Sequence, residues 1–116
     1  MDFALAARRG RVGTVVEVAG ELDMSTTSRL RDGLLEVVAS GARVVVVDLT
    51  AVRFMDSSGL GALVVAYKEL RARDGWLGLA GVQPPVRKVL SVTSVDRVIE
   101  SFDTVQDAEE ASPATP

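Results

Sequence analysis

Apolar residues along this chain fall into short continuous or alternating runs and into longer repeats at helical spacing. The run Val44-Val45-Val46-Val47 is continuous, which is typical of a strand buried on both faces. Residues 3–7 and 14–19 form two earlier strand-like runs, and the glycine-containing turn between them predicts an opening hairpin. Residues 76–80 and 98–102 are predicted to form two further short strands.

Four other segments predict helices. One begins in the Ser/Thr-rich stretch 24–28 and ends at Ser40-Gly41, and a second begins directly after Asp56. Pro84-Pro85 suits the first turn of a third, and Thr104 begins a short last helix that runs to about residue 110. The side chains predicted to face inward recur at three- and four-residue spacing: Leu30, Leu34, Val37, Val38, Leu60, Leu63, Val64, Tyr67, Leu70, Val86, Val89 and Leu90.

Strands and helices alternate after the hairpin, which predicts a single α/β domain built on a mixed sheet. The domain is predicted to cover residues 3–111, with residues 112–116 as a disordered C-terminal tail. Two arrangements of the helices remain open. A doubly wound sheet would carry helices on both faces, whereas the antiparallel start and the short chain favour helices packed largely on one face.

Composition and charge narrow the functions that this chain can carry out. The formal net charge is -3 and the isoelectric point is about 4.9, so direct nucleic-acid binding is disfavoured. The chain has no Cys and no His, which removes thiolate chemistry, the commonest metal ligand and any Ser-His-Asp arrangement. An enzyme built on this chain would need Lys, Asp or Glu for its chemistry. We expect a protein that is not an enzyme and has no catalytic residue, cofactor or metal.

The N-terminus and the apolar runs indicate where the protein is found. The N-terminus lacks a basic region followed by an apolar core, and no apolar run approaches the ~20 residues of a membrane span. We expect a cytoplasmic protein that does not enter a membrane.

The stretch Asp56-Ser57-Ser58-Gly59 lies where the second helix should open, and four interpretations of it compete. It is a helix N-cap, a nucleophilic serine, a nucleotide-binding loop, or a serine that accepts phosphate at a helix mouth rich in N–H groups. The nucleophile lacks an activating His and the preceding glycine of a nucleophile elbow, and no Gly-Lys-Ser/Thr pair supports the nucleotide loop. Gly59 and Gly61 each weaken a helix start by roughly 1 kcal/mol relative to Ala, a cost that is more easily understood if the backbone here must be approached closely.

Two motifs together resemble a known family. Gly20-Glu21-Leu22-Asp23 and Phe54-Met55-Asp56-Ser57-Ser58-Gly59-Leu60-Gly61, with the strand ending Val47-Asp48-Leu49 between them, resemble the bacterial anti-sigma factor antagonists, which are single STAS domains. The resemblance implies a mixed sheet with helices largely on one face. It also implies that Ser57 accepts phosphate and that Asp23 lies on the same surface. The residues expected to contact a partner are Asp23, Asp56, Ser58, Gly59 and Gly61.

The resemblance also implies a circuit. The unphosphorylated protein would bind an anti-sigma factor that is also an ATP-dependent serine kinase, and so release the sigma factor. Phosphorylation of Ser57 would end this binding, and a PP2C-type phosphatase would restore it. We expect a monomer or weak dimer; the alternatives are a STAS subunit of a larger signalling assembly and, less well supported, a nucleotide-binding domain.

Overall fold

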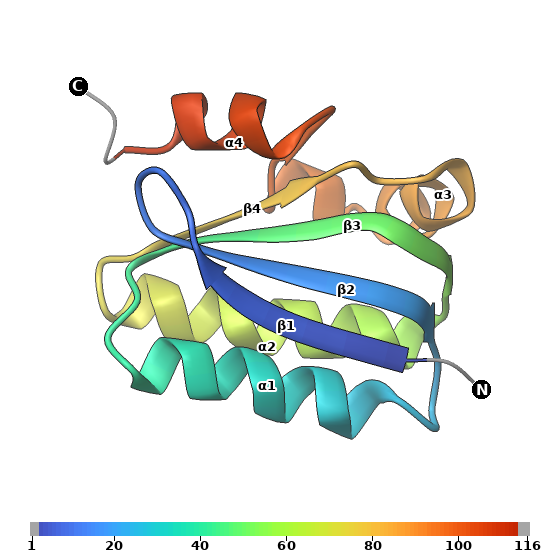
Figure 1. The fold of residues 1–116 in the computed structure, drawn as a ribbon. Coiled ribbons are helices and arrows are strands. Elements are labelled where there is room, and N and C mark those ends of the chain that lie inside the picture. Colours follow the sequence, from blue (N-terminus) through green and yellow to red (C-terminus); the bar gives the residue numbers. More distant parts are fainter. Residues whose placement is uncertain (1–2, 114–116) are drawn as a thin grey trace.

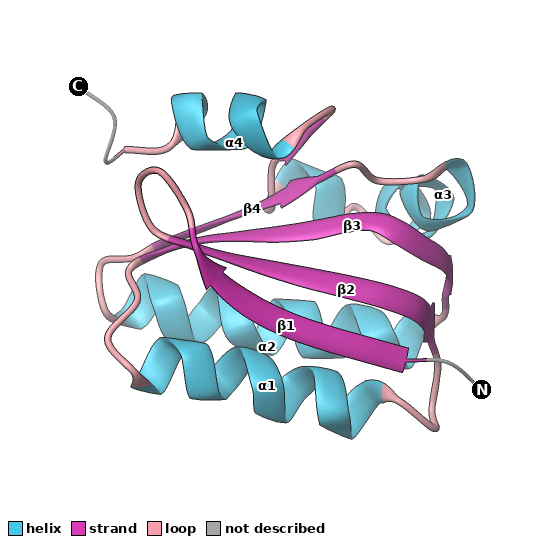
Figure 2. Cartoon of the chain, viewed as in Figure 1, coloured by secondary structure: helices cyan, strands magenta, loops and turns pink. Residues whose placement is uncertain are grey.

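The computed structural model describes residues 3–113, which form one sheet with helices packed against it (Figures 1 and 2). The strands are β1 (Phe3–Arg9), β2 (Thr14–Leu22), β3 (Val44–Met55), β4 (Trp76–Ala80) and β5 (Ser101–Phe102). The helices are α1 (Thr27–Ala39), α2 (Ser57–Ala72), α3 (Pro84–Val92) and α4 (Val105–Ala111), with a 3-10 turn η1 (Val95–Arg97) before β5.

The strand order follows the chain, β1-β2-β3-β4-β5, and this order decides where the helices lie. β1 is antiparallel to β2, whereas β2 to β5 are parallel. Because each parallel connection advances in the same direction and crossovers are right-handed, successive helices fall on one face. α1 and α2 lie side by side under the sheet, and α4 crosses the opposite face (Figure 1). The prediction of a mixed sheet with helices largely on one face is confirmed.

The central Val run is buried on both faces, as predicted. Val45 and Val47 face the main core, which also takes in α1, α2 and α3, while Val46 packs with Val15 and Ala108 beneath α4. Most of the predicted inward side chains are buried. Val37, Val64, Tyr67 and Val89 are instead partly buried at the margin of the main core.

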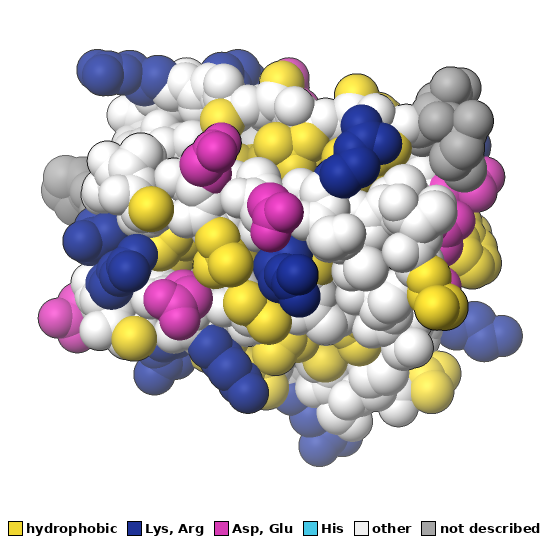
Figure 3. Space-filling view, turned by 90° about the horizontal axis from the view of Figure 1, so that it is seen from below, with side chains coloured by type: hydrophobic (Ala, Val, Ile, Leu, Met, Phe, Trp, Pro, Cys, Tyr) yellow, Lys and Arg dark blue, Asp and Glu magenta, His cyan; other side chains and the backbone are white. Residues whose placement is uncertain are grey.

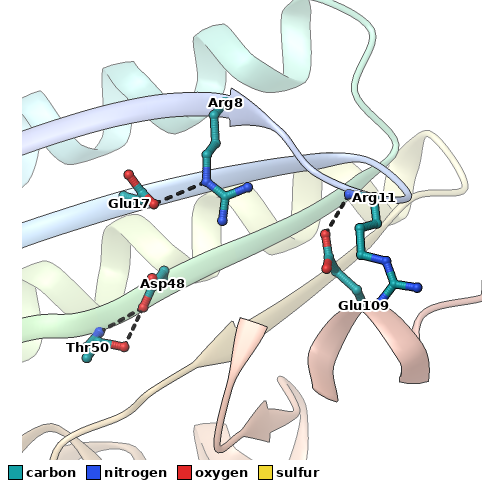
Figure 4. Close-up of polar contacts among 6 residues, drawn as sticks. All are labelled: Arg8, Arg11, Glu17, Asp48, Thr50 and Glu109. Atoms are coloured by element: carbon teal, nitrogen blue, oxygen red, sulfur yellow. Dashed lines mark hydrogen bonds and ion pairs between the residues drawn. The ribbon is translucent and has the colours of Figure 1, made fainter. Parts of the chain in front are cut away.

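α4 is tied to the β1–β2 turn by a carboxylate. Glu109 is buried, and its Oε2 accepts a hydrogen bond from the backbone N–H of Arg11 at 2.8 Å (Figure 4). A Cβ on Gly10 would lie 2.5 Å from the same oxygen, so the turn leaves room for this carboxylate. The predicted cap of α4 is confirmed, because Thr104 Oγ1 accepts from the backbone N–H of Asp107 at 3.0 Å.

Two strands extend further than predicted. β2 continues to Leu22, three residues beyond the predicted run 14–19. β3 continues to Met55, six residues beyond Leu49, where the strand was expected to end. Leu22 and Met55 are paired in the parallel β2–β3 ladder, and both are buried. The ladder shifts register at two points before this pair, so the strands stay paired although their apolar patterns are interrupted.

The C-terminal part differs in two respects. The expected strand over residues 98–102 is reduced to Ser101–Phe102, because the chain forms η1 first and Val98 stays exposed. Ser112 is buried, and its hydroxyl donates to the carbonyl oxygen of Glu109 at 2.9 Å. The packed domain therefore reaches at least Ser112, one residue into the expected tail; residues 114–116 lie outside the described residues.

Candidate functional site

The site begins where β3 meets α2. Asp56 is the N-cap of α2, and its Oδ1 accepts hydrogen bonds from the backbone N–H groups of Ser58 at 2.9 Å and Gly59 at 3.3 Å. The same oxygen accepts from the Ser58 hydroxyl at 2.5 Å. The N-cap interpretation is confirmed for Asp56, and it leaves the phosphorylation interpretation of the neighbouring serine open.

The two neighbouring serines lie in different environments. Ser58 is partly buried and its hydroxyl is committed to Asp56. Ser57 is exposed, and its hydroxyl has no hydrogen-bond partner among the described residues. Only Ser57 therefore presents a free hydroxyl to another protein without breaking an existing contact.

The segment from Gly20 to Asp23 lies beside this helix mouth. The backbone N–H of Asp56 donates to the carbonyl oxygen of Leu22 at 3.0 Å. Thr27 Oγ1 donates to the carbonyl oxygen of Ser58 at 2.7 Å, which joins the start of α1 to the first turn of α2. The two motifs that are separate in sequence therefore form one surface.

Thr26 holds the turn before α1 in place. It is 2% exposed, its Oγ1 donates to the carbonyl oxygen of Glu21 at 2.8 Å, and it accepts from the N–H of Asp23 at 3.1 Å. Thr26 makes no capping bond to α1, although the Ser/Thr-rich stretch predicted caps there. The sequence did not reveal the hydrogen bonds by which Thr26 and Thr27 support the site. A threonine that caps a helix and one that donates to the backbone of another segment look alike in the sequence.

Two carboxylates lie in the region of Ser57: Asp56 directly precedes it, and Asp23 is near enough to Asp56 for their charges to interact. The hydroxyl of Ser25 donates to Asp23 Oδ1 at 2.6 Å and lowers the pKa of Asp23, while the charge of Asp56 acts in the opposite direction. The hydroxyl of Ser58 likewise lowers the pKa of Asp56. Both groups are ionised at neutral pH, so a negative charge added to Ser57 enters an acidic surface. We call Asp23, Asp56 and Ser57 the acidic site.

The two glycines of the second motif have different surroundings. Gly59 is buried, and a Cβ at this position would lie 2.7 Å from Leu22 Cβ and 3.0 Å from the Leu22 carbonyl oxygen. The close approach of the protein's own β2 therefore accounts for a glycine here, and contact of Gly59 with a partner stays a prediction. Gly61 is exposed, and nothing lies within 4 Å of a Cβ built there.

Two large apolar side chains that sequence reasoning did not select are exposed beside the acidic site. Met24, next to Asp23, is 81% exposed, and Phe54, two residues before Asp56, is 46% exposed. Phe54 pairs with Glu21 in the β2–β3 ladder, which places it at the same end of the sheet. Their only signal in the sequence is position: Met24 directly follows the first motif, and Phe54 is the first residue of the second.

Charged side chains do not gather into a basic patch on the face formed by α1 and α2. Lysine and arginine side chains are spread across this face among acidic and apolar ones (Figure 3). Within residues 3–113, no group of three or more His, Cys, Asp or Glu side chains is placed to hold a metal ion. No helix in the same residues is both long and apolar enough to cross a membrane.

We predict that Asp56→Ala lowers the free energy of unfolding by about 1 kcal/mol at pH 7, because α2 loses its N-cap. The folded-state pKa of Asp56 is lowered from its ordinary value of 3.8. Its contribution is therefore full above pH 3.8 and is lost as the pH falls through the folded-state pKa. The measurement is urea unfolding of both proteins at several pH values from 7 downward.

The control for this prediction is Asp56→Asn, which keeps a capping oxygen but cannot titrate. We expect the Asn variant to stay close to the native protein at pH 7 and to lack its loss of stability in acid. If native protein and Asp56→Ala differ equally at every pH, the Asp56 carboxylate does not carry this dependence.

Comparison with known proteins shows which family this chain resembles. Residues 4–108 match the STAS domain family. The chain is 36% identical over 83 residues to an anti-sigma-B factor antagonist of Listeria monocytogenes, covering 72% of this chain and 73% of that protein. It superposes on a crystal structure of an anti-sigma factor antagonist from Mycobacterium paratuberculosis with a TM-score of 0.88 and 31% identity, covering 96% of this chain and 94% of the other.

A third relative is the Bacillus protein SpoIIAA, solved in two forms. The unphosphorylated form superposes with a TM-score of 0.78 and 26% identity, covering 92% of this chain and 94% of that chain. The phosphorylated form superposes with a TM-score of 0.70 and 26% identity, covering 94% of this chain and 97% of that chain. The family match spans nearly the whole chain, and the predicted resemblance is confirmed. The chain belongs to the STAS domain family.

Proposed function

We propose that this protein is an anti-sigma factor antagonist whose binding to its anti-sigma factor is ended by phosphorylation of Ser57. The observation that carries the proposal is the difference between the two serines: the Ser57 hydroxyl is exposed and unpartnered among the described residues, whereas the Ser58 hydroxyl donates to Asp56. The names of the Listeria and Mycobacterium relatives support the partner class, and the phosphorylated form of SpoIIAA supports the modification.

The partner that we propose is an anti-sigma factor that is also an ATP-dependent serine kinase. In the unphosphorylated state it docks on the acidic site, with Met24 and Phe54 supplying apolar contact and Gly61 allowing its backbone to approach α2. Docking releases the sigma factor. The same kinase then transfers phosphate to the Ser57 hydroxyl, and a PP2C-type phosphatase removes it.

Phosphate acts in this scheme by repulsion. The N–H groups of Ser58 and Gly59, which an anion at a helix mouth would otherwise use, are already bound by Asp56. A phosphate on Ser57 carries ≈ -1.5 to -2 charge at pH 7. It would therefore remain exposed beside the carboxylates of Asp23 and Asp56, and it would raise the cost of burying this surface against a partner.

The protein is then a regulatory substrate and binding partner, not a catalyst. We propose that it acts in the cytoplasm, where an anti-sigma factor meets its sigma factor, and that it works as a monomer or weak dimer. Its own contribution to the circuit is the charge state of the acidic site.

The proposal is tested by incubating the protein with the anti-sigma kinases of its organism and ATP, followed by mass-spectrometric site mapping. We expect one phosphate, on Ser57. Ser58→Ala should still be phosphorylated at Ser57, and Ser57→Ala should take up none. Phosphate on Ser58 of the native protein, or on neither serine with any of these kinases, would refute the assignment.

A further inference from the structure

A hollow in the surface lies away from the acidic site, toward the other end of α2. Ser57 opens this helix and Arg71 stands in its last turn, 14 residues on, so about 20 Å of helix separates them. The hollow is a cavity of about 420 Å³ between α2, the start of β4 and the segment that follows η1. Pockets for small molecules measure roughly 300–1,000 Å³, so this one can hold a small organic ligand.

Two guanidinium groups line the cavity. Arg71 is held in place by Tyr67, because it donates to the Tyr67 hydroxyl at 2.8 Å and its guanidinium carbon lies 5.7 Å from the centre of the Tyr67 ring. Arg97 enters from η1 and has no ion pair among residues 3–113. Glu100 also lines the cavity, which leaves a net charge of about +1 in a chain whose net charge is -3.

The edge of β4 adds a backbone donor. β5 pairs only with Leu79 and Ala80, so the beginning of β4 has no neighbour on that side. The backbone N–H of Trp76 donates to the carbonyl oxygen of Arg43, on the β3 side of β4, and the N–H of Leu79 donates to the carbonyl oxygen of Glu100, on the opposite side. Because successive N–H groups of a strand point to alternate sides, the N–H of Leu77 points to the same side as that of Leu79, which is the open edge. Leu77 lines the cavity, and its N–H has no hydrogen-bond partner in the described part of the chain.

The rest of the wall is aromatic and apolar. Tyr67 and Trp76 are each half-buried and line the cavity, and Val98 beside them is 55% exposed although it is a large apolar residue. Aromatic rings and an exposed valine offer contact area for a flat apolar group. The cavity thus contains two guanidinium groups and a backbone N–H that can donate to an anion, next to an apolar surface that can contact a flat ring.

We propose that this cavity binds a small aromatic anion, a flat ring joined to a phosphate or carboxylate group. The anionic group accepts hydrogen bonds from Arg71, Arg97 and the Leu77 N–H, and guanidinium groups suit both kinds of anion because their planar N–H groups match paired oxygens. The ring rests against Tyr67, Trp76 and Val98. The site is separate from the acidic site and does not depend on the function proposed above.

Trp76 provides the readout, because it is the chain's only tryptophan and its indole N–H gives a single assignable NMR signal. The probes are phenylphosphate and benzoate, titrated into ¹⁵N-labelled full-length protein. We expect saturable shifts of the Trp76 indole and Leu77 amide signals. Inorganic phosphate and phenol, which each carry half of the ligand's chemistry, should bind at least about tenfold more weakly than the better of the two probes.

The matched variants are Arg97→Gln and Arg73→Gln. Arg97→Gln removes a cavity cation and should weaken binding about tenfold, whereas Arg73→Gln should change it less than about twofold. Arg73 lies just beyond the same helix and pairs with Glu69 at 3.8 Å, outside the cavity. Ser57→Ala should bind as the native protein does, since its change lies in the other site.

The relative affinity of the two probes identifies the anionic group: tighter phenylphosphate indicates a phosphate ligand, and tighter benzoate a carboxylate. The proposal is overturned if neither probe gives a saturable shift, if inorganic phosphate binds as tightly as both, or if the two arginine variants lose affinity equally. Unchanged spectra of the variants away from the cavity establish that they are folded.

Discussion

We expect Ser57→Asp to weaken binding of the anti-sigma factor by a few hundredfold, equivalent to a penalty of ~3–4 kcal/mol. The substitution adds a third carboxylate near Asp23 and Asp56, on the surface where we propose that the partner docks and displaces water. Both of those carboxylates have a lowered pKa and stay ionised at neutral pH, so the new charge is not relieved by their protonation. The measurement is calorimetric titration of the variant with the purified anti-sigma factor.

Ser57→Asn separates charge from size, because Asn matches Asp in shape and is neutral. We expect Ser57→Ala to bind like the native protein and Ser57→Asn to lose much less than Ser57→Asp. Adding Asp23→Asn to Ser57→Asp should restore part of the affinity, since it removes one of the repelling groups. Equal losses for Asp and Asn would mean that bulk at Ser57, and not charge, controls binding.

The largest effect on stability is expected from Gly59→Ala, which should lower the free energy of unfolding by about 1–3 kcal/mol. The new Cβ would lie 2.7 Å from Leu22 Cβ, and a distance below 3.0 Å requires α2 or β2 to shift. Leu22 is fully buried and its carbonyl oxygen accepts from Asp56, so the strand cannot move without disturbing the acidic site. Urea denaturation measures the change.

Gly61→Ala is the matched control for this prediction, two residues further along the same helix. A Cβ there meets nothing within 4 Å, so the higher helix propensity of Ala should raise the free energy of unfolding by roughly 0.5–1 kcal/mol. The same change should weaken binding of the anti-sigma factor if its backbone approaches this position. A Gly59→Ala protein as stable as Gly61→Ala would show that β2 yields without cost.

The elements of the fold were largely predictable from local pattern. The Val run predicted a doubly buried strand, and residues 76–80 and the capping Thr104 were assigned correctly because tight turns and caps leave local signatures. β2 and β3 were predicted too short, because Leu22 and Met55 are buried by pairing with each other across 33 residues of chain. Pairing between two distant parallel strands does not by itself produce a regular pattern of apolar residues in either strand.

The candidate site was predicted in part. The motif pair pointed to Asp23, Asp56 and Ser57, and the absence of His and Cys from the sequence argued against a nucleophilic serine. The packing of Gly59 against β2 could not be predicted, because a glycine that lets a partner approach and one that lets the chain's own strand approach are the same residue in sequence. Met24, Phe54 and Thr27 were missed because their exposure or contacts depend on segments far along the chain.

The sequence by itself determined the class of fold, the family and the acidic, hydroxyl-bearing stretch at the start of α2, because these depend on local periodicity, capping chemistry and motif order. The family resemblance had selected Ser57, but only the tertiary structure gave the physical difference between the two serines, because Asp56 Oδ1 accepts from the Ser58 hydroxyl. The structure also shows how Asp23 comes near Asp56, which the resemblance had only implied, and it alone gathered Arg71, Arg97 and the open edge of β4 around one cavity. Such juxtapositions depend on strand order and helix packing, which bring together residues that are distant in the chain.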